Sequence, residues 1–300
     1  MQAIPIHESA ALLAATCWAL SGVVSAGPVA HLGPLAFTRI RMTMVMVMLG
    51  GWSAISGGWQ SITPDQLLPI AFSGAVGIFI GDTMLFMALN RLGPRRTSII
   101  FSTNAPMSVL LGWMFLGEKL SVSELAGIGL VVAGVVLAII FGKRRSQLHQ
   151  WEQVKGALWI GIAFGLGAAL SQAIGSLIAR PVMETGTDPA SVSALRVTVS
   201  VICFAMAYAI APGTMRARNP LTLNVGLLVA FSGFIAMALG MTFVLFALAG
   251  GEVGIIATLS ATSPAIILPM IWLRTGERPA LGAWIGAALV IAGSALIFTS

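Results

Sequence analysis

The sequence is poor in charged residues. Asp, Glu, Lys and Arg make up 9% of its 300 residues, whereas a soluble domain carries roughly 25%. Hydrophobic residues make up 57%, and the mean hydropathy is +0.96. Apolar stretches long enough for a helical crossing, about 20 residues each, recur from Ala10 to Phe298 with short interruptions. A soluble fold is excluded, and the sequence predicts an all-α integral membrane protein.

The residues of redox, metal and nucleotide chemistry are equally scarce. The chain has two cysteines, Cys17 and Cys203, and both lie in apolar stretches where packing is expected instead of a disulfide. The His-Glu pair at 7–8 lacks the second His of a zinc-protease motif, and the Gly-Leu-Gly at 165–167 lacks the strand of a dinucleotide site. We therefore predict no catalytic residue, metal site or cofactor, and no enzyme.

The apolar stretches and the turn residues between them predict about ten spans. Gly27-Pro28, Gly57-Gly58, Gly93-Pro94, Asn219-Pro220 and Gly250-Gly251 mark the breaks. The expected helices are 9–30, 34–53, 66–90, 94–116, 122–141, 153–180, 187–211, 222–249, 252–273 and 279–299. A basic linker at 143–152 divides the chain into a first half, 1–142, and a second half, 153–300.

The two halves repeat one another. Pro106, an apolar run and Gly117-Glu118 are followed by Gly127 and Gly134, and the same order recurs as Pro264, Gly276-Glu277, Gly286 and Gly293. Upstream, Gly81-Asp82-Thr83 matches Gly240-Met241-Thr242, and Arg39 matches Arg196. Because each half has an odd number of spans, the second crosses the bilayer in the opposite sense to the first. Inverted repeats of this kind favour alternating access around a midplane cavity.

Basic residues gather at one end of the predicted bundle. The loops on the side of the linker, called the linker side below, carry Arg91, Arg95, Arg96, Lys143, Arg144, Arg145, Lys155, Arg216, Arg218, Arg274 and Arg278, whereas the termini side has little beyond Lys119 and Arg180. The positive-inside rule makes the linker side cytoplasmic and both termini extracytoplasmic. Cations spread over span ends without interleaved aromatics do not predict nucleic-acid binding.

Charged residues inside the spans are the first candidates for a site, because each costs about 2.5 to 3.5 kcal/mol to insert. Asp82 is the one carboxylate well inside a span, and Arg39 and Arg41 lie in the same half of the bilayer. A pair of Asp82 with one of these arginines could be a structural clasp, a gate or part of a ligand site. Arg196 has no matching acid, since Met241 stands where the first half has Asp82.

Polar residues beside two prolines are the second group of candidates. Pro106 and Pro264 are predicted inside helices, where each frees a backbone carbonyl that could line a cavity. Polar and aromatic side chains that could contact a solute are Trp18, Phe79, Thr83, Phe101, Asn104, Trp113, Trp159, Gln172, Thr262 and Ser263. The hydroxyls could equally bond the preceding helical turn, and the aromatics could pack against lipid or helices.

The doubled pattern of Pro, apolar run, Gly-Glu and Gly-x6-Gly resembles the EamA branch of the drug/metabolite transporter superfamily and, more narrowly, its aromatic amino acid exporters. The resemblance covers both halves. It implies a ten-helix carrier of small metabolites in a bacterial inner membrane, with a central cavity. Such carriers are often drawn with cytoplasmic termini, opposite to the loop charges of this chain.

The sequence thus predicts a secondary transporter that exports small metabolites, with amino acids, including aromatic ones, as the leading class and a monomer as the working unit. A carrier of drugs or other metabolites is the alternative. An intramembrane enzyme would have Asp82 as its one acid in a span, and a membrane scaffold without transport would need no central cavity.

Overall fold

The computed structural model describes residues 6–116, 121–142, 153–250, 259–260 and 262–298. The linker 143–152 with its three basic residues, together with Glu118, Lys119 and Ala261, lies outside this set. The first half contains α1 (Ile6–Leu32), α2 (Pro34–Ser56), η1 (Gly58–Ser61), η2 (Pro64–Gln66), α3 (Leu67–Ser73), η3 (Gly74–Ile80), α4 (Gly81–Phe101), α5 (Asn104–Leu111), η4 (Gly112–Leu116) and α6 (Val122–Phe141). The second half contains α7 (Leu158–Glu184), α8 (Pro189–Ile210), α9 (Pro212–Met215), α10 (Leu223–Gly233), η6 (Phe234–Met241), α11 (Thr242–Gly250), α13 (Ser263–Thr275) and α14 (Leu281–Phe298).

Glycines with a left-handed or extended positive φ end several of these helices. Gly33 (φ 82°), Gly57 (φ 73°) and Gly276 (φ 72°) each close one helix, and Gly93 (φ 78°) divides α4 where the Gly-Pro break was predicted. The predicted break at Gly27-Pro28 is wrong. Pro28 lies inside α1, and the turn comes at Gly33-Pro34, because Pro34 can begin α2 without losing a hydrogen bond.

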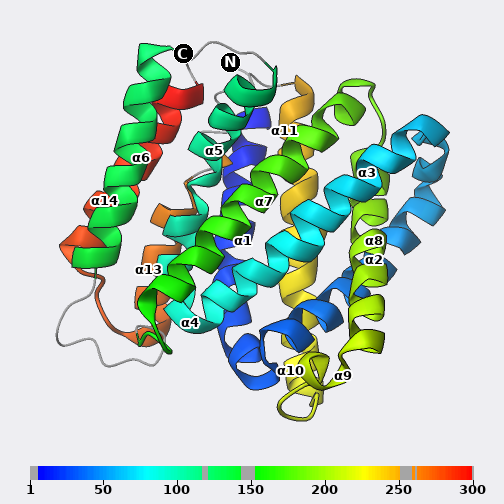
Figure 1. The fold of residues 1–300 in the computed structure, drawn as a ribbon, viewed down its shortest axis with the longest axis horizontal. Coiled ribbons are helices and arrows are strands. Elements are labelled where there is room, and N and C mark those ends of the chain that lie inside the picture. The colour runs from blue at the N-terminus through cyan, green and yellow to red at the C-terminus, as the bar shows by residue number, and fades with distance from the viewer. Residues whose placement is uncertain (1–5, 117–120, 143–152, 251–258, 261, 299–300) are drawn as a thin grey trace.

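The described helices form an all-α membrane protein in two inverted halves. α1 begins and α14 ends at the same end of the molecule, and α6 ends at the opposite end, where α7 begins (Figure 1). α4 packs on α7, and the equivalent elements of the repeat, α10, η6 and α11, pack on α1. Two other large interfaces join equivalent elements to one another, α2 to α8 and α6 to α14. This pattern is that of a two-fold relation between the halves.

The Gly-x6-Gly motifs explain how α6 and α14 can pack so closely. A Cβ on Gly127 would lie 2.6 Å from the carbonyl oxygen of Gly293, and one on Gly293 would lie 2.6 Å from that of Gly127. Gly134 and Gly286 make the same reciprocal contact, at 2.7 and 2.6 Å. Small residues allow helix backbones to approach in this way where no hydrophobic force joins them. The repeated motif is therefore a pair of helix crossings.

Wide π-helical turns occur in both halves, and besides η4 in the first half, two of them, η3 and η6, fall in equivalent spans. η3 precedes Gly81 in the first half, and η6 extends to Met241, the residue after Gly240, in the second. The two glycines are repeat equivalents, so both irregular segments fall at matching places. A π-helical turn shifts the backbone pairing from i+4 to i+5 and is frequent at functional sites.

The outer surface of the bundle is apolar. Side chains such as Ile55 (86% exposed), Phe72 (59%), Ile202 (53%) and Leu273 (87%) point outward, which water would disfavour and lipid accommodates. Within the described residues, six helical segments are long and apolar enough to cross a membrane by length and composition alone. The protein is a multi-pass membrane protein.

Candidate functional site

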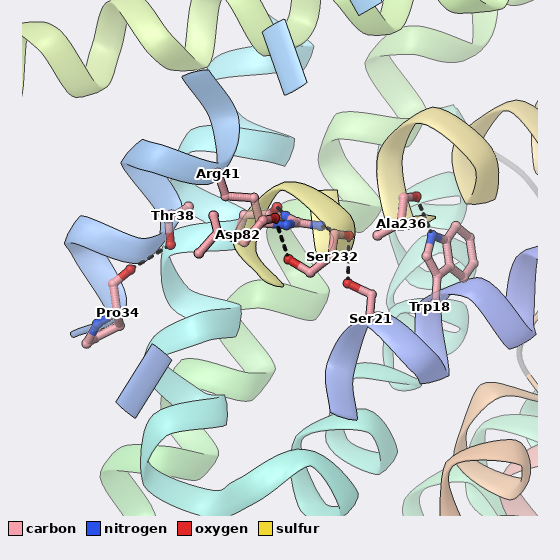
Figure 2. Close-up of polar contacts among 9 residues, drawn as sticks. Trp18, Ser21, Pro34, Thr38, Arg41, Asp82, Ser232 and Ala236 are labelled. Atoms are coloured by element: carbon pink, nitrogen blue, oxygen red, sulfur yellow. Dashed lines mark hydrogen bonds and ion pairs between the residues drawn. The ribbon is translucent and has the colours of Figure 1, made fainter. Parts of the chain in front are cut away.

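A buried ion pair lies at the junction of the two halves. Arg41 of α2 donates from Nη1 to Oδ2 of Asp82, in the first turn of α4, across 3.0 Å (Figure 2). The two side chains are 2% and 12% exposed. The partner of Asp82 is thus Arg41 and not Arg39. In a low-dielectric setting each charge depends on the other for its neutralisation.

The ion pair is tied to the second half through backbone carbonyls. Arg41 donates from Nη2 to the carbonyl of Ser232 across 3.5 Å, and the hydroxyl of Ser21 donates to the same oxygen across 3.0 Å. One turn further along, Trp18 Nε1 donates to the carbonyl of Ala236 across 3.1 Å. These acceptors lie around the start of η6, and Figure 2 shows all three donors converging on it. Side chains of α1 and α2 therefore clamp the irregular segment of the second half.

A second buried arginine lies near the pair. Arg196 of α8 is 6% exposed, and its Nε and Nη2 find no hydrogen-bond partner among the described residues. It packs against η3: a Cβ on Gly74 would lie 2.5 Å from the Arg196 carbonyl oxygen, and one on Gly77 would lie 3.0 Å from Nη2. Asp82 is close enough for its charge to act on Arg196. Arg41 is therefore ion-paired with Asp82, whereas Arg196 makes no ion pair among the described residues.

Arg39, the repeat equivalent of Arg196, takes a different environment. Its guanidinium lies over the ring of Tyr208 in α8, with 4.7 Å from Cζ to the ring centroid. A cation over an aromatic face gains about 0.5 to 2 kcal/mol. The halves are therefore chemically unequal, as the mismatch between Asp82 and Met241 indicated.

An aromatic pair closes the ion pair off on the linker side. Phe37 and Phe86 meet edge to face with 4.7 Å between ring centroids, and both are buried, at 0% and 4% exposed. The Arg41 guanidinium lies over the Phe86 ring at 5.0 Å. Sequence reasoning did not single out Phe37, Ser21 or Ser232. Nothing in their spacing separates them from ordinary packing residues.

The prolines do not lie where they were predicted. Pro106 falls in the first turn of α5 and Pro264 in the first turn of α13, not inside continuous helices. The missing N–H of each proline is harmless there, because first-turn amides have no helical partner. The hydroxyls of Thr103 and Thr262 each donate 2.7 Å back to the carbonyl three residues earlier. Both breaks are thus closed by their own side chains.

The other predicted residues are scattered around this centre. Ser263 donates 3.1 Å to the carbonyl of Ala15 in α1, and Phe79 packs edge to face on Phe204 at 4.7 Å. Gln172 bonds Ser176 in its own helix at 3.3 Å. The remaining ones are partly buried: Thr83, whose hydroxyl has no hydrogen-bond partner among the described residues, Phe101 and Asn104. Trp113 (51% exposed) and Trp159 (70%) face outward and are not cavity residues.

Two arginines placed in linker-side loops are instead buried in α4. Arg95 is 2% exposed and donates 3.1 Å to the carbonyl of Ala138 in the last turn of α6, and Arg96 is 6% exposed. A cation there satisfies a carbonyl that the helix leaves unpaired and complements the helix dipole. These two arginines therefore support packing as well as loop charge.

A pocket of about 460 Å³ opens at the linker side. Residues from both halves line it: Leu32, Gly33, Pro34, Leu35, Ala36, Met87, Asn90, Arg91, Lys155, Gly156, Phe164, Thr214, Arg216 and Arg218. The volume falls in the range of small-molecule sites, about 300 to 1,000 Å³. Ala36 and Met87, on its inner wall, directly adjoin the closing pair Phe37 and Phe86 in sequence.

Two inverted halves, a charged contact at their junction and a pocket at one end define the class of carriers that work from a pseudo-symmetric interface. The sequence comparisons agree with this class. The EamA-like transporter family matches residues 6–140 and again residues 159–299, so the chain belongs to the EamA-like transporter family. It is a transporter of small metabolites.

Named relatives share a quarter of their residues with this chain. A "Probable amino-acid metabolite efflux pump" of Escherichia coli (strain K12) is 26% identical over 289 residues, covering 94% of this chain and 91% of its own. A "Probable terminal-alkyne amino-acid exporter" of Streptantibioticus cattleyicolor is 27% identical over 271 residues, covering 88% and 84%. An "Uncharacterized transporter in cobO 3'region" of Sinorhizobium sp. is 28% identical over 133 residues, covering 44% of this chain and 94% of its own.

The same architecture occurs among solved structures. One crystal structure superposes with a TM-score of 0.69 over 97% of this chain and 95% of its own. The sequences are 16% identical, so this likeness concerns the fold alone.

Proposed function

We propose that the protein exports amino acids, including aromatic ones, across the inner membrane of a bacterium by alternating access. The observation that carries the proposal is the buried Arg41–Asp82 pair, which is linked to Ser232 across the junction of the halves. Charges are retained at such depth where they serve a pathway or a switch. The names of two relatives, an efflux pump and an exporter of amino-acid compounds, support the choice of solute.

In this proposal the ion pair and its neighbours hold one closed state. Three bonds cross the junction, from Arg41, Ser21 and Trp18 to carbonyls of the second half. Each such bond contributes a net of about 0.5 to 1.5 kcal/mol, so the three together stabilise the state by about 1.5 to 4.5 kcal/mol. A difference of a few kcal/mol separates states that interconvert readily. The clasp is therefore strong enough to close the junction and weak enough to release it.

The halves, residues 1–142 and 153–300 joined by the linker 143–152, would rock against one another, with the broken helices at Pro106 and Pro264 absorbing the motion. Separation exposes a midplane cavity lined by Trp18, Phe79, Thr83, Phe101, Asn104, Gln172, Thr262 and Ser263. Arg196, whose Nε and Nη2 have no hydrogen-bond partner among the described residues, would receive the carboxylate of the solute there. The linker side is the cytoplasmic side, as its basic residues indicate, and a monomer carries out the cycle.

The test is flux in liposomes that contain the pure full-length protein. Labelled phenylalanine, threonine and a panel of other metabolites should be screened, and saturable uptake of at least one amino acid above that of empty liposomes is expected. Arg196→Gln should abolish it, whereas Arg278→Gln, an exposed arginine at the end of the bundle, should not. If no amino acid is taken up faster than by empty liposomes and another metabolite is transported instead, the proposed solute class is wrong.

A further inference from the structure

The lining of the linker-side pocket has an excess of positive charge. Arg91, Lys155, Arg216 and Arg218 line it, and no acidic residue is among the described residues of the lining. Four cations around one cavity attract an anion from solution and raise its local concentration. The pocket is therefore built for a negatively charged group.

Two of the four cations are held in place by other parts of the wall. Arg91 donates 3.4 Å to the carbonyl of Lys155 and lies over the ring of Phe164 at 5.7 Å. Lys155 in turn donates its backbone N–H 2.9 Å to the carbonyl of Arg91. These contacts join Arg91 of α4, in the first half, to the segment just before α7, in the second half. The guanidinium of Arg91 is thus oriented before any ligand arrives.

Arg218 is fixed on the opposite wall. Its backbone N–H donates 3.0 Å to the carbonyl of Leu32, and its side chain lies against Gly33, where a Cβ would be 3.1 Å from Nε. Gly33 has a φ of 82°, so a larger residue is disfavoured there. The turn between α1 and α2 therefore keeps the room that the Arg218 side chain occupies.

The position of the pocket relates it to the closed junction. Its inner wall includes Ala36 and Met87, each five residues from a member of the ion pair, Arg41 and Asp82. At 1.5 Å per helical residue this is about 7.5 Å along each helix axis. Phe37 lies between Ala36 and Arg41 in α2, Phe86 lies between Asp82 and Met87 in α4, and the two rings meet edge to face. A ligand in the pocket thus waits directly outside the aromatic pair that closes the centre.

We propose that this pocket is the first binding site of the exported solute and that its cations take the solute's carboxylate, with Phe164 against the apolar part. The inference rests on the proposed function, because it assumes a solute that enters from the linker side. An oxyanion could also come from the phosphate of a lipid head group. The solute is the choice the structure favours, since the pocket lies between the halves and ends at the closing pair.

The experiment compares Arg91→Gln, Arg218→Gln and their double variant with wild type, in liposomes of phosphatidylcholine alone and with added phosphatidylglycerol. The apparent KM for labelled phenylalanine presented at the linker side should rise about tenfold in the double variant in both lipids. L-Phenylalaninamide, which lacks the carboxylate, should compete poorly with labelled phenylalanine for transport by the wild-type protein. Arg91→Lys combined with Arg218→Lys should recover most of the affinity. Arg278→Gln, which removes an equal charge outside the pocket lining, should leave KM unchanged.

Three results would overturn the assignment while the wild-type protein still transports. These are an unchanged KM in the double variant, equal competition by the amide, and a defect seen only with phosphatidylglycerol, which would assign the pocket to lipid phosphate. Absence of amino acid flux in the wild type is a different result and concerns the proposed function. If the glutamine double variant has a lowered melting temperature, the double lysine variant decides the question. A purely structural role of the two arginines does not predict that lysines restore KM.

Discussion

Removing Asp82 should cost more stability than removing its partner Arg41. Asp82→Asn leaves Arg41 buried at 2% exposed without a countercharge, and Arg196 also loses the one carboxylate near it. Arg41→Gln leaves Asp82 with Arg196 still close enough to act on its charge. The two halves of one ion pair are therefore not equivalent.

The magnitude follows from the burial of the pair. Breaking a buried ion pair by removing one partner costs about 3 to 5 kcal/mol, which for a large domain is about 6 to 20 °C in Tm. We expect Asp82→Asn to reach this range and Arg41→Gln to cost about half as much. The double change to Leu at both positions should recover most of the stability, because no unpaired charge of the pair remains.

Thermal unfolding of the detergent-solubilised protein, followed by tryptophan fluorescence, measures these shifts, and flux is measured in parallel. Asp65→Asn is the matched control, since Asp65 is an exposed carboxylate in η2. If the variant with Leu at positions 41 and 82 is stable but transports nothing, the ion pair is needed for transport and not for folding. Equal Tm values for wild type and Asp82→Asn would refute the reasoning that the Asp82 carboxylate stabilises the fold by neutralising buried arginine charge.

Three further substitutions test the packing around the site. Gly134→Leu should lower Tm strongly, because a Cβ there would lie 2.7 Å from the Gly286 carbonyl, while Gly129→Leu on the same helix meets nothing within 4 Å and should be neutral. Gly77→Val should abolish flux by displacing Arg196, whose Nη2 lies 3.0 Å from a Cβ at this position; full flux would contradict the contact. Phe37→Ala should cost about 3 to 5 kcal/mol of stability and speed solute leak through the closed state, whereas Phe72→Ala, 59% exposed, should do neither.

Much of the architecture could be predicted from the sequence because hydropathy and the repeat act over long stretches. The Gly-Pro break at Gly93, the αL turn at Gly57 and the inverted halves all follow from local rules or from the doubled motif. Pro28 was mistaken for a break, because a proline within a helix can be accommodated by neighbouring helices in a membrane.

The site was predicted only in outline. Asp82 and its possible arginine partners stand out because charges in an apolar span are rare, but the choice of Arg41 over Arg39 depends on helix rotation, which spacing alone does not fix. Ser21, Phe37 and Ser232 belong to residue types that are common in any span. The linker-side pocket is formed by four separate segments, and their charges, read singly, indicated only topology.

The reciprocal glycine contact between α6 and α14 has the geometry of an isologous interface. Gly127 meets Gly293 and Gly134 meets Gly286, and because Gly127 and Gly286 are repeat equivalents, as are Gly134 and Gly293, the contact maps onto itself when the halves exchange places. Two-fold homodimers have this property. The contacts of α4 with α7 and of α1 with α11 instead turn into one another. If the halves exchange conformations as proposed, the α6–α14 seam would keep its contacts and act as a pivot, while α1, α4, α7 and α11 would exchange environments around it.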